Sequence, residues 1–126
     1  MKLRIKGDSL RLRLTRGEVQ ALADQGVVED SVRFGPGSAL AYRLRRDAQA
    51  SVLSAAYSPS GIEIRVPERA ASDWCATEQV TLAGSQGSGD AELRIVVEKD
   101  FACLAPREGE DESDNFPHPE TGAKTC

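Results

Sequence analysis

Hydrophobic and charged residues alternate from the start of the chain in a pattern that predicts strands. Apolar residues take every second position in residues 3–5 and again in residues 10–14, and a polar turn at residues 7–9 separates the two runs. Successive side chains of a strand point to opposite faces, so two such runs joined by a short turn indicate a β-hairpin. We therefore expect an antiparallel pair at the beginning of the chain.

A short helix and a second hairpin are predicted to follow. Thr15 and Glu18 have the spacing of a capping box, and Gly26 is a residue at which a helix commonly ends. The next apolar alternation turns at Gly35-Pro36-Gly37, where glycine supplies the positive φ that tight turns require. A phosphate-binding loop would continue into Gly-Lys-Ser/Thr and a helix, so we interpret this segment as a hairpin turn.

The second half of the chain repeats this series of elements. Residues 2–47 and residues 51–100 each have the apolar spacing of a ββαββ unit, and Pro67-Glu68 begins the second helix as Thr15 begins the first. We predict an α+β fold made of this duplicated unit. Its eight mostly antiparallel strands would form a half-barrel or tunnel with two short helices, within a single domain over residues 1–105.

The C-terminal residues differ in composition from this domain. Residues 106–126 contain six Asp or Glu and few apolar side chains, whereas residues 1–46 contain ten Lys or Arg against five Asp or Glu. A segment with so little to bury cannot offset its ordering entropy, so we predict an acidic flexible tail. Because opposite charges lie on one chain, the tail itself is a candidate partner of the basic part, with Phe116 as an apolar anchor.

The remaining composition favours a soluble cytoplasmic protein. The formal net charge is −4, and no apolar run approaches the roughly 18 residues of a membrane span, so no membrane partner is expected. The charged start of the chain does not resemble a secretory signal. Three cysteines without Cys-x-x-Cys spacing favour reduced thiols, and Cys75 falls on the predicted buried stripe of the second helix.

Assigning the apolar residues to the core places a strongly basic set on the opposite strand face. Such like charges repel unless an anion, a partner or the tail compensates them, although water and salt also screen a solvated face. Arginine suits bidentate recognition of phosphate or carboxylate. The candidate ligand-binding residues are Arg4, Arg11, Arg13, Arg33, Arg43, Arg45, Arg65 and Arg94.

Metal-ligand and catalytic candidates are fewer. Carboxylates of the second unit, Glu63, Glu92 and Glu98, are candidates to hold Mg²⁺ or to form cross-strand ion pairs with arginine. A second weak set consists of Cys103, His118 and Cys126, whose spacing matches no common zinc pattern. The single histidine lies in the tail, so we expect no catalytic triad.

Three segments of the chain resemble one known family. They are Met1–Leu14, Phe34–Gly37 and Val97–Leu104 followed by an acidic Phe-Pro tail, and they resemble a family of short bacterial proteins of unknown function. The resemblance spans nearly the whole chain and implies no activity.

The predicted architecture also resembles the triphosphate tunnel (CYTH) superfamily, whose eight strands enclose a charged lumen for phosphate-rich substrates. This resemblance implies that the basic face would line a lumen. The first strand here has Lys2-x-Arg4-x-Lys6 in place of the Glu-x-Glu-x-Lys that holds metal in that superfamily. The difference implies phosphate binding without metal-assisted hydrolysis.

These features lead to one expected function and its alternatives. We expect a small non-enzymatic binding protein, without a cofactor, that holds a phosphorylated or other anionic small molecule or polyphosphate on the basic strand face. The alternatives are a Mg-dependent triphosphate or organophosphate hydrolase of the tunnel type, and metal binding through the Cys/His tail. Nucleic acid is not an expected partner, because Tyr42, Tyr57 and Trp74 all fall on apolar positions and leave no stacking platform.

Overall fold

The computed structural model describes residues 1–101 of the 126-residue chain. Eight strands, two α-helices and one turn of 3-10 helix follow one another in this part. In chain order they are β1 (Lys2–Ile5), β2 (Ser9–Leu14), α1 (Arg16–Gln25), β3 (Val27–Gly35), β4 (Ser38–Asp47), β5 (Ser54–Ser58), β6 (Gly61–Pro67), α2 (Glu68–Ala76), β7 (Thr81–Gln86), η1 (Gly89–Ala91) and β8 (Leu93–Lys99).

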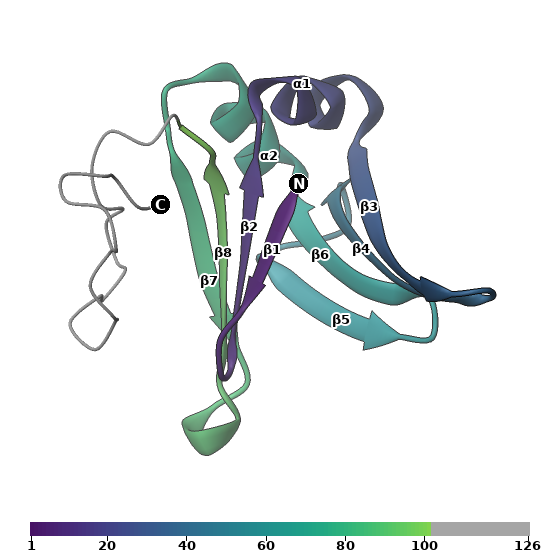
Figure 1. Cartoon of the computed structure of the whole chain (residues 1–126). Helices are drawn as coiled ribbons and strands as arrows, with labels where there is room; N and C mark the ends of the chain where they lie inside the picture. Colours follow the sequence, from purple (N-terminus) through teal and green to yellow (C-terminus); the bar gives the residue numbers. More distant parts are fainter. Residues whose placement is uncertain (102–126) are drawn as a thin grey trace, which may run out of the picture.

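The strands form two separate four-stranded sheets (Figure 1). Sheet A has the order β1-β2-β8-β7 and sheet B the order β3-β4-β6-β5. Each sheet consists of one hairpin from the first half of the chain and one from the second. The two central strands, β2 with β8 and β4 with β6, pair in parallel, while all pairings within hairpins are antiparallel.

The helix boundaries follow the sequence signals. The Thr15 side chain accepts a hydrogen bond from the Glu18 N–H while the Glu18 side chain accepts one from the Thr15 N–H, which is the predicted capping box. Helix α1 ends at Gly26, whose φ of 80° is the left-handed conformation that glycine adopts at lowest cost. Pro67 precedes α2, as expected from its fixed φ.

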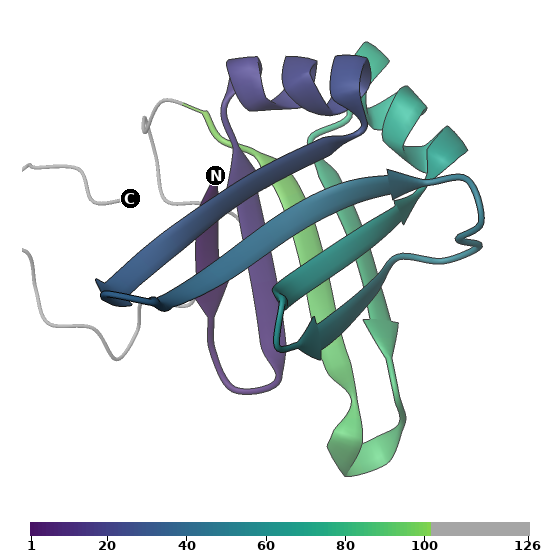
Figure 2. The ribbon, with the colours of Figure 1, turned by 90° about the vertical axis from the view of Figure 1, so that its right-hand side faces the viewer.

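The core lies between the two sheets, and the helices cover one end of it (Figure 2). Trp74 of α2 is fully buried, and its indole N–H donates to the Val80 carbonyl oxygen at 2.9 Å. The alternating apolar residues of both sheets supply most of the other core side chains. The buried cluster consists of Leu12, Leu14, Leu22, Val28, Tyr42, Leu44, Ile64, Val66, Ala71, Trp74, Ile95 and Val97.

The two sheets diverge away from the helices, as Figure 1 shows. Several residues whose apolar positions predicted burial are therefore exposed, although the register of Val32 and Tyr57 places both on the core-facing side. Val32 and Phe34 on β3 are 45% and 69% exposed, and Tyr57 on β5 is 81% exposed. The prediction of burial was wrong at these positions because no element packs against the far ends of β3 and β5 in the described part of the chain.

The α+β class with eight strands and two helices is confirmed. Neither sheet closes on itself, so the structure does not confirm the expected half-barrel or tunnel. The acidic tail predicted over residues 106–126 lies outside the described residues. Within residues 1–101, neither helix is long and apolar enough to cross a membrane.

Candidate functional site

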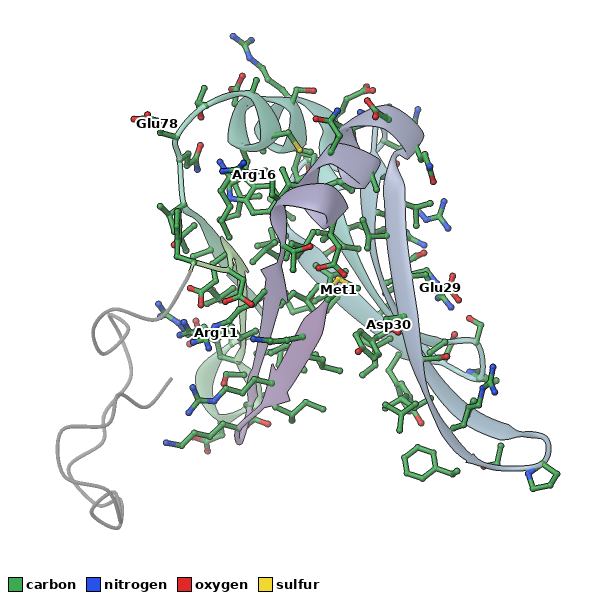
Figure 3. All side chains as sticks on the ribbon, turned by 45° about the horizontal axis from the view of Figure 1, so that its top comes forward. Met1, Arg11, Arg16, Glu29, Asp30 and Glu78 are labelled. Carbon is green, nitrogen blue, oxygen red and sulfur yellow. The ribbon has the colours of Figure 1, made fainter. Side chains whose placement is uncertain are left out.

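The eight candidate arginines lie on the sheet faces that point away from the core. They do not form one group. Arg4, Arg11, Arg13 and Arg94 lie on sheet A, whereas Arg33, Arg43, Arg45 and Arg65 lie on sheet B. Figure 3 shows that Arg11 and Glu29 project from opposite outer sides of the molecule, so the two groups cannot bind one small ligand together.

Four basic side chains occupy two adjacent cross-strand pairs on the outer face of sheet A. Arg4 lies directly opposite Arg11, and Lys2 lies directly opposite Arg13. Side chains at such positions start only about 5 Å apart, where like charges destabilise the pair. We call Lys2, Arg4, Arg11, Arg13 and Arg94 the sheet A basic face.

The carboxylate of Glu98 lies in the middle of this face and contacts two of its arginines. Arg11 Nη1 donates to both carboxylate oxygens at 3.0 and 3.1 Å, and Arg13 Nε donates to Oε1 at 2.6 Å. Glu98 is only 8% exposed, which makes it the buried charged residue of the described chain. A buried carboxylate needs such partners, so Glu98 fixes the positions of Arg11 and Arg13.

The successive cross-strand rows of sheet A differ in charge. The row through Arg13 continues to Glu98, but the row through Arg4 and Arg11 continues to Val96 and contains no carboxylate. Val96 is 6% exposed although it lies outside the core cluster. This row therefore contains two guanidinium groups and the nearly buried apolar side chain of Val96.

The edges of the sheet A basic face carry further charges. At one end, Lys2 Nζ lies 3.0 Å from a carboxylate oxygen of Asp100. At the other, Arg94 and Glu92 border a hollow of about 400 Å³ together with residues of β7. Acids therefore border both ends of the face, and Glu98 contacts Arg11 and Arg13 at its centre.

Sheet B has a different charge pattern, because acidic and basic residues alternate across its strands. Glu29, Arg43 and Glu63 lie in one cross-strand row. Arg43 Nε lies 3.4 Å from Glu29, while Arg45 and Arg65 donate to Glu63 at 2.9 and 2.8 Å. Each of these arginines is paired with a carboxylate.

These hydrogen bonds perturb the titration of Glu63. The bonds from Arg45 and then Arg65 lower the pKa of its carboxyl below the usual value, and burial opposes them only in part. The guanidinium of Arg65 has its pKa raised by the same hydrogen bond. Glu63 is thus held ionised as a structural partner of arginine.

The candidate magnesium ligands are not brought together. Glu63 is on sheet B, Glu98 is on sheet A, and Glu92 lies between η1 and β8. No group of three or more His, Cys, Asp or Glu side chains suited to a metal ion occurs within residues 1–101. The other candidate set, Cys103, His118 and Cys126, lies outside the described residues.

A cavity of about 590 Å³ lies beside both helices near the end of β8. Its lining includes Arg16, Cys75, Lys99 and Phe101.

Cys75 is half-buried, as its predicted place on the helix stripe implies, and its thiol contacts the Val19 carbonyl oxygen at 3.7 Å. Burial raises the pKa of this thiol, although Lys99 and Arg46 oppose the shift. The thiol is therefore a poor nucleophile at neutral pH.

Sequence reasoning identified Glu63 as a candidate for cross-strand ion pairs with arginine, and it makes such pairs with Arg45 and Arg65. It missed Glu29, and it missed Gln86, whose side chain connects the two sheets. Glu29 could have been found, because a hairpin turning at residues 35–37 places it opposite Arg43. Gln86 could not. Its amide both accepts from the Ala55 N–H and donates to the Ala55 carbonyl, each at 2.8 Å, and so joins β7 to β5.

Comparisons with known proteins give a family but no activity. No curated protein and no solved structure matches the chain. One family matches over residues 1–120, which is nearly the full length and includes every strand and helix described above. The chain therefore belongs to a family of unknown function, DUF7009.

Proposed function

We infer that this protein is a non-enzymatic binding domain that holds a phosphorylated or other anionic ligand on the sheet A basic face. The observation that carries this proposal is an excess of positive charge: four basic side chains occupy two adjacent cross-strand pairs, and the carboxylate of Glu98 lies among them and bonds to Arg11 and Arg13. An anion bridging the basic side chains would relieve their repulsion and accept several charge-assisted hydrogen bonds.

The arrangement of Glu98 supports the same choice of face. By fixing Arg11 and Arg13, this carboxylate reduces the side-chain entropy that a ligand would otherwise have to offset on binding. On sheet B two carboxylates, Glu29 and Glu63, pair with Arg43, Arg45 and Arg65, so that face has the smaller excess of positive charge.

The test is titration of the full chain with tripolyphosphate at low salt, followed by calorimetry. Arg11→Gln should weaken binding about tenfold or more, because a hydrogen bond to a charged group contributes about 1.5–3 kcal/mol. The matched control is Arg65→Gln on sheet B, which removes the same charge and should leave the affinity nearly unchanged. No binding by the natural chain, or equal losses in the two variants, would refute the proposal.

A Mg-dependent hydrolase is the rival function, and the separation of Glu63, Glu92 and Glu98 on the molecule does not favour it. Incubation with tripolyphosphate and Mg²⁺ distinguishes the two functions. Release of phosphate that Glu98→Gln abolishes would favour the hydrolase. Binding without turnover favours the binding domain.

The acidic tail enters the proposal as a competitor for the same face. Residues 106–126 carry six carboxylates and are connected to β8, which itself contributes Arg94. A short tether raises the effective concentration of such a segment to about millimolar. Deleting residues 106–126 should therefore tighten tripolyphosphate binding at low salt, whereas unchanged or weaker binding would exclude competition by the tail.

Internal duplication, likeness to the triphosphate tunnel superfamily and the cellular setting are also part of this proposal. The equivalent parallel pairings of β2 with β8 and of β4 with β6 support an origin by internal duplication. The repeated ββαββ order and the exposed arginines are what support the likeness to the triphosphate tunnel superfamily. A cytoplasmic and bacterial setting stays a prediction from the sequence.

A further inference from the structure

Within residues 1–101, strand β3 forms an edge of sheet B and is exposed along most of its length. It is nine residues long, and β4 is its only neighbour in the sheet among these residues. Residues 29–35 are all exposed. Figure 2 shows that the strand projects beyond the body of the described chain. A long free edge is a template for pairing with another strand, and proteins usually block it.

The direction of the backbone groups on this edge follows from the pairing with β4. The Arg46 N–H donates to the Gly26 carbonyl oxygen at 2.8 Å, in the same register that pairs Val28 with Leu44. Hydrogen-bonded residues alternate in an antiparallel pair, so Glu29, Ser31 and Arg33 turn their N–H and C=O groups to the open edge. In agreement, the Ser31 N–H is bonded to the Asp30 side chain at 2.9 Å instead of to β4.

The charges along this edge are self-complementary. If two copies of β3 pair in antiparallel fashion about a two-fold axis at Ser31, Glu29 of each copy lies opposite Arg33 of the other. All four side chains then lie on the outer face, because Glu29 and Arg33 share that face of sheet B. Moving the axis to Glu29 or to Arg33 instead places like charges opposite each other.

Two apolar residues near the end of β3 are exposed in the single chain. Phe34 and Val32 are 69% and 45% exposed in the single chain. In the register centred on Ser31, Phe34 of one copy, which lies at the irregularity near the end of β3, is opposite Val28 of the other, and Val32 is opposite Asp30. Pairing would thus cover part of the exposed apolar surface at the end of β3.

From these observations we propose that two copies of this chain associate through β3. Their sheets B form one continuous eight-stranded sheet, with two Glu29–Arg33 ion pairs across the interface. The interface uses only the edge of sheet B, so it is independent of the anion-binding face proposed on sheet A. Alternate antiparallel hydrogen bonds supply the affinity, and the two ion pairs fix the register.

The test is sedimentation equilibrium of the full chain and of charge-reversed variants. Glu29→Arg and Arg33→Glu each place like charges in both cross-copy pairs. The dimer affinity of each variant alone should therefore fall by about tenfold or more. An equimolar mixture of the two variants restores opposite charges in both pairs and should recover the natural dimer affinity. The double variant E29R/R33E should recover it as well.

Recovery of the dimer affinity in the mixture would show that the two residues pair across the interface. A general effect of net charge on association would not produce this recovery. The exposed residue Arg69 of α2 provides the control, since Arg69→Glu changes the net charge as Arg33→Glu does and should leave dimerisation unchanged. Circular dichroism would show that each variant is folded. A natural chain that stays monomeric at millimolar concentration, or a mixture that associates no better than its components, would overturn the proposal.

Discussion

Gly61 at the start of β6 packs directly against the backbone of Ala41 in β4. A Cβ atom on Gly61 would lie under 3.0 Å from the Ala41 carbonyl oxygen, and the φ of Gly61 is 115°. We predict that Gly61→Ala lowers the free energy of unfolding by about 1–3 kcal/mol from the backbone conformation alone, with the steric contact adding to this. Urea denaturation measures the change.

Gly17 in α1 is the matched control for this substitution. A Cβ there has no heavy atom within 4 Å, and its φ is not positive. Gly17→Ala should raise the free energy of unfolding by about 0.5–1 kcal/mol, because alanine has the higher helix propensity. Equal effects of the two substitutions would contradict the close packing of β4 and β6.

The Gln86 side chain should stabilise the contact between the two sheets. Its amide makes two hydrogen bonds to the backbone of Ala55, which Gln86→Ala removes. We expect a loss of about 1 kcal/mol in the free energy of unfolding, since two part-buried backbone groups of Ala55 would lose their partner. The exposed residue Gln49 serves as the control, and Gln49→Ala should change stability by less than about 0.5 kcal/mol.

Acid should weaken sheet B through Glu63. Hydrogen bonds from Arg45 and then Arg65 lower its pKa in the folded protein below the usual value of a glutamate. A lowered folded pKa means that the contribution to stability is complete above the pKa of the unfolded chain and is lost as the pH falls through the folded value. Glu63→Gln should therefore destabilise the protein at neutral pH. In acid, the variant and the natural chain should converge, and a constant difference would contradict the prediction.

The Cys75 thiol should react slowly while the protein is folded. Burial raises its pKa, with Lys99 and Arg46 opposing the shift, so little thiolate is present at neutral pH. In a chain with Cys103→Ser and Cys126→Ser, we expect alkylation at pH 7 to be slower than that of a free cysteine. Unfolding in urea should remove the protection, and equally fast alkylation before and after unfolding would be inconsistent with it.

Local structure was predictable from this sequence because its signals are local. The capping box at Thr15, the stop at Gly26 and the turn near Pro36 each depend on a few adjacent residues. Period-two alternation also identified the buried side of most strands, including Leu12 and Leu14.

The candidate site could be predicted only in part, because it depends on which hairpins share a sheet. Alternation placed the arginines away from the core, but it could not show that Arg11 and Arg45 belong to different sheets. The partner of Arg11 and Arg13 is Glu98, more than eighty residues away in the chain. Hydrophobic periodicity carries no information about such pairings.

The central place of β8 in sheet A has a consequence for the synthesis of the protein. This strand (Leu93–Lys99) lies between β2 and β7, yet it is the last strand of the described chain to leave the ribosome. Until it emerges, β2 has no partner on one side, and sheet A lacks the apolar side chains of Ile95 and Val97. The domain can therefore complete sheet A only after residue 99 has been translated, and a ribosome that stalls before residue 93 would hold an incomplete sheet with open edges exposed to chaperones and proteases.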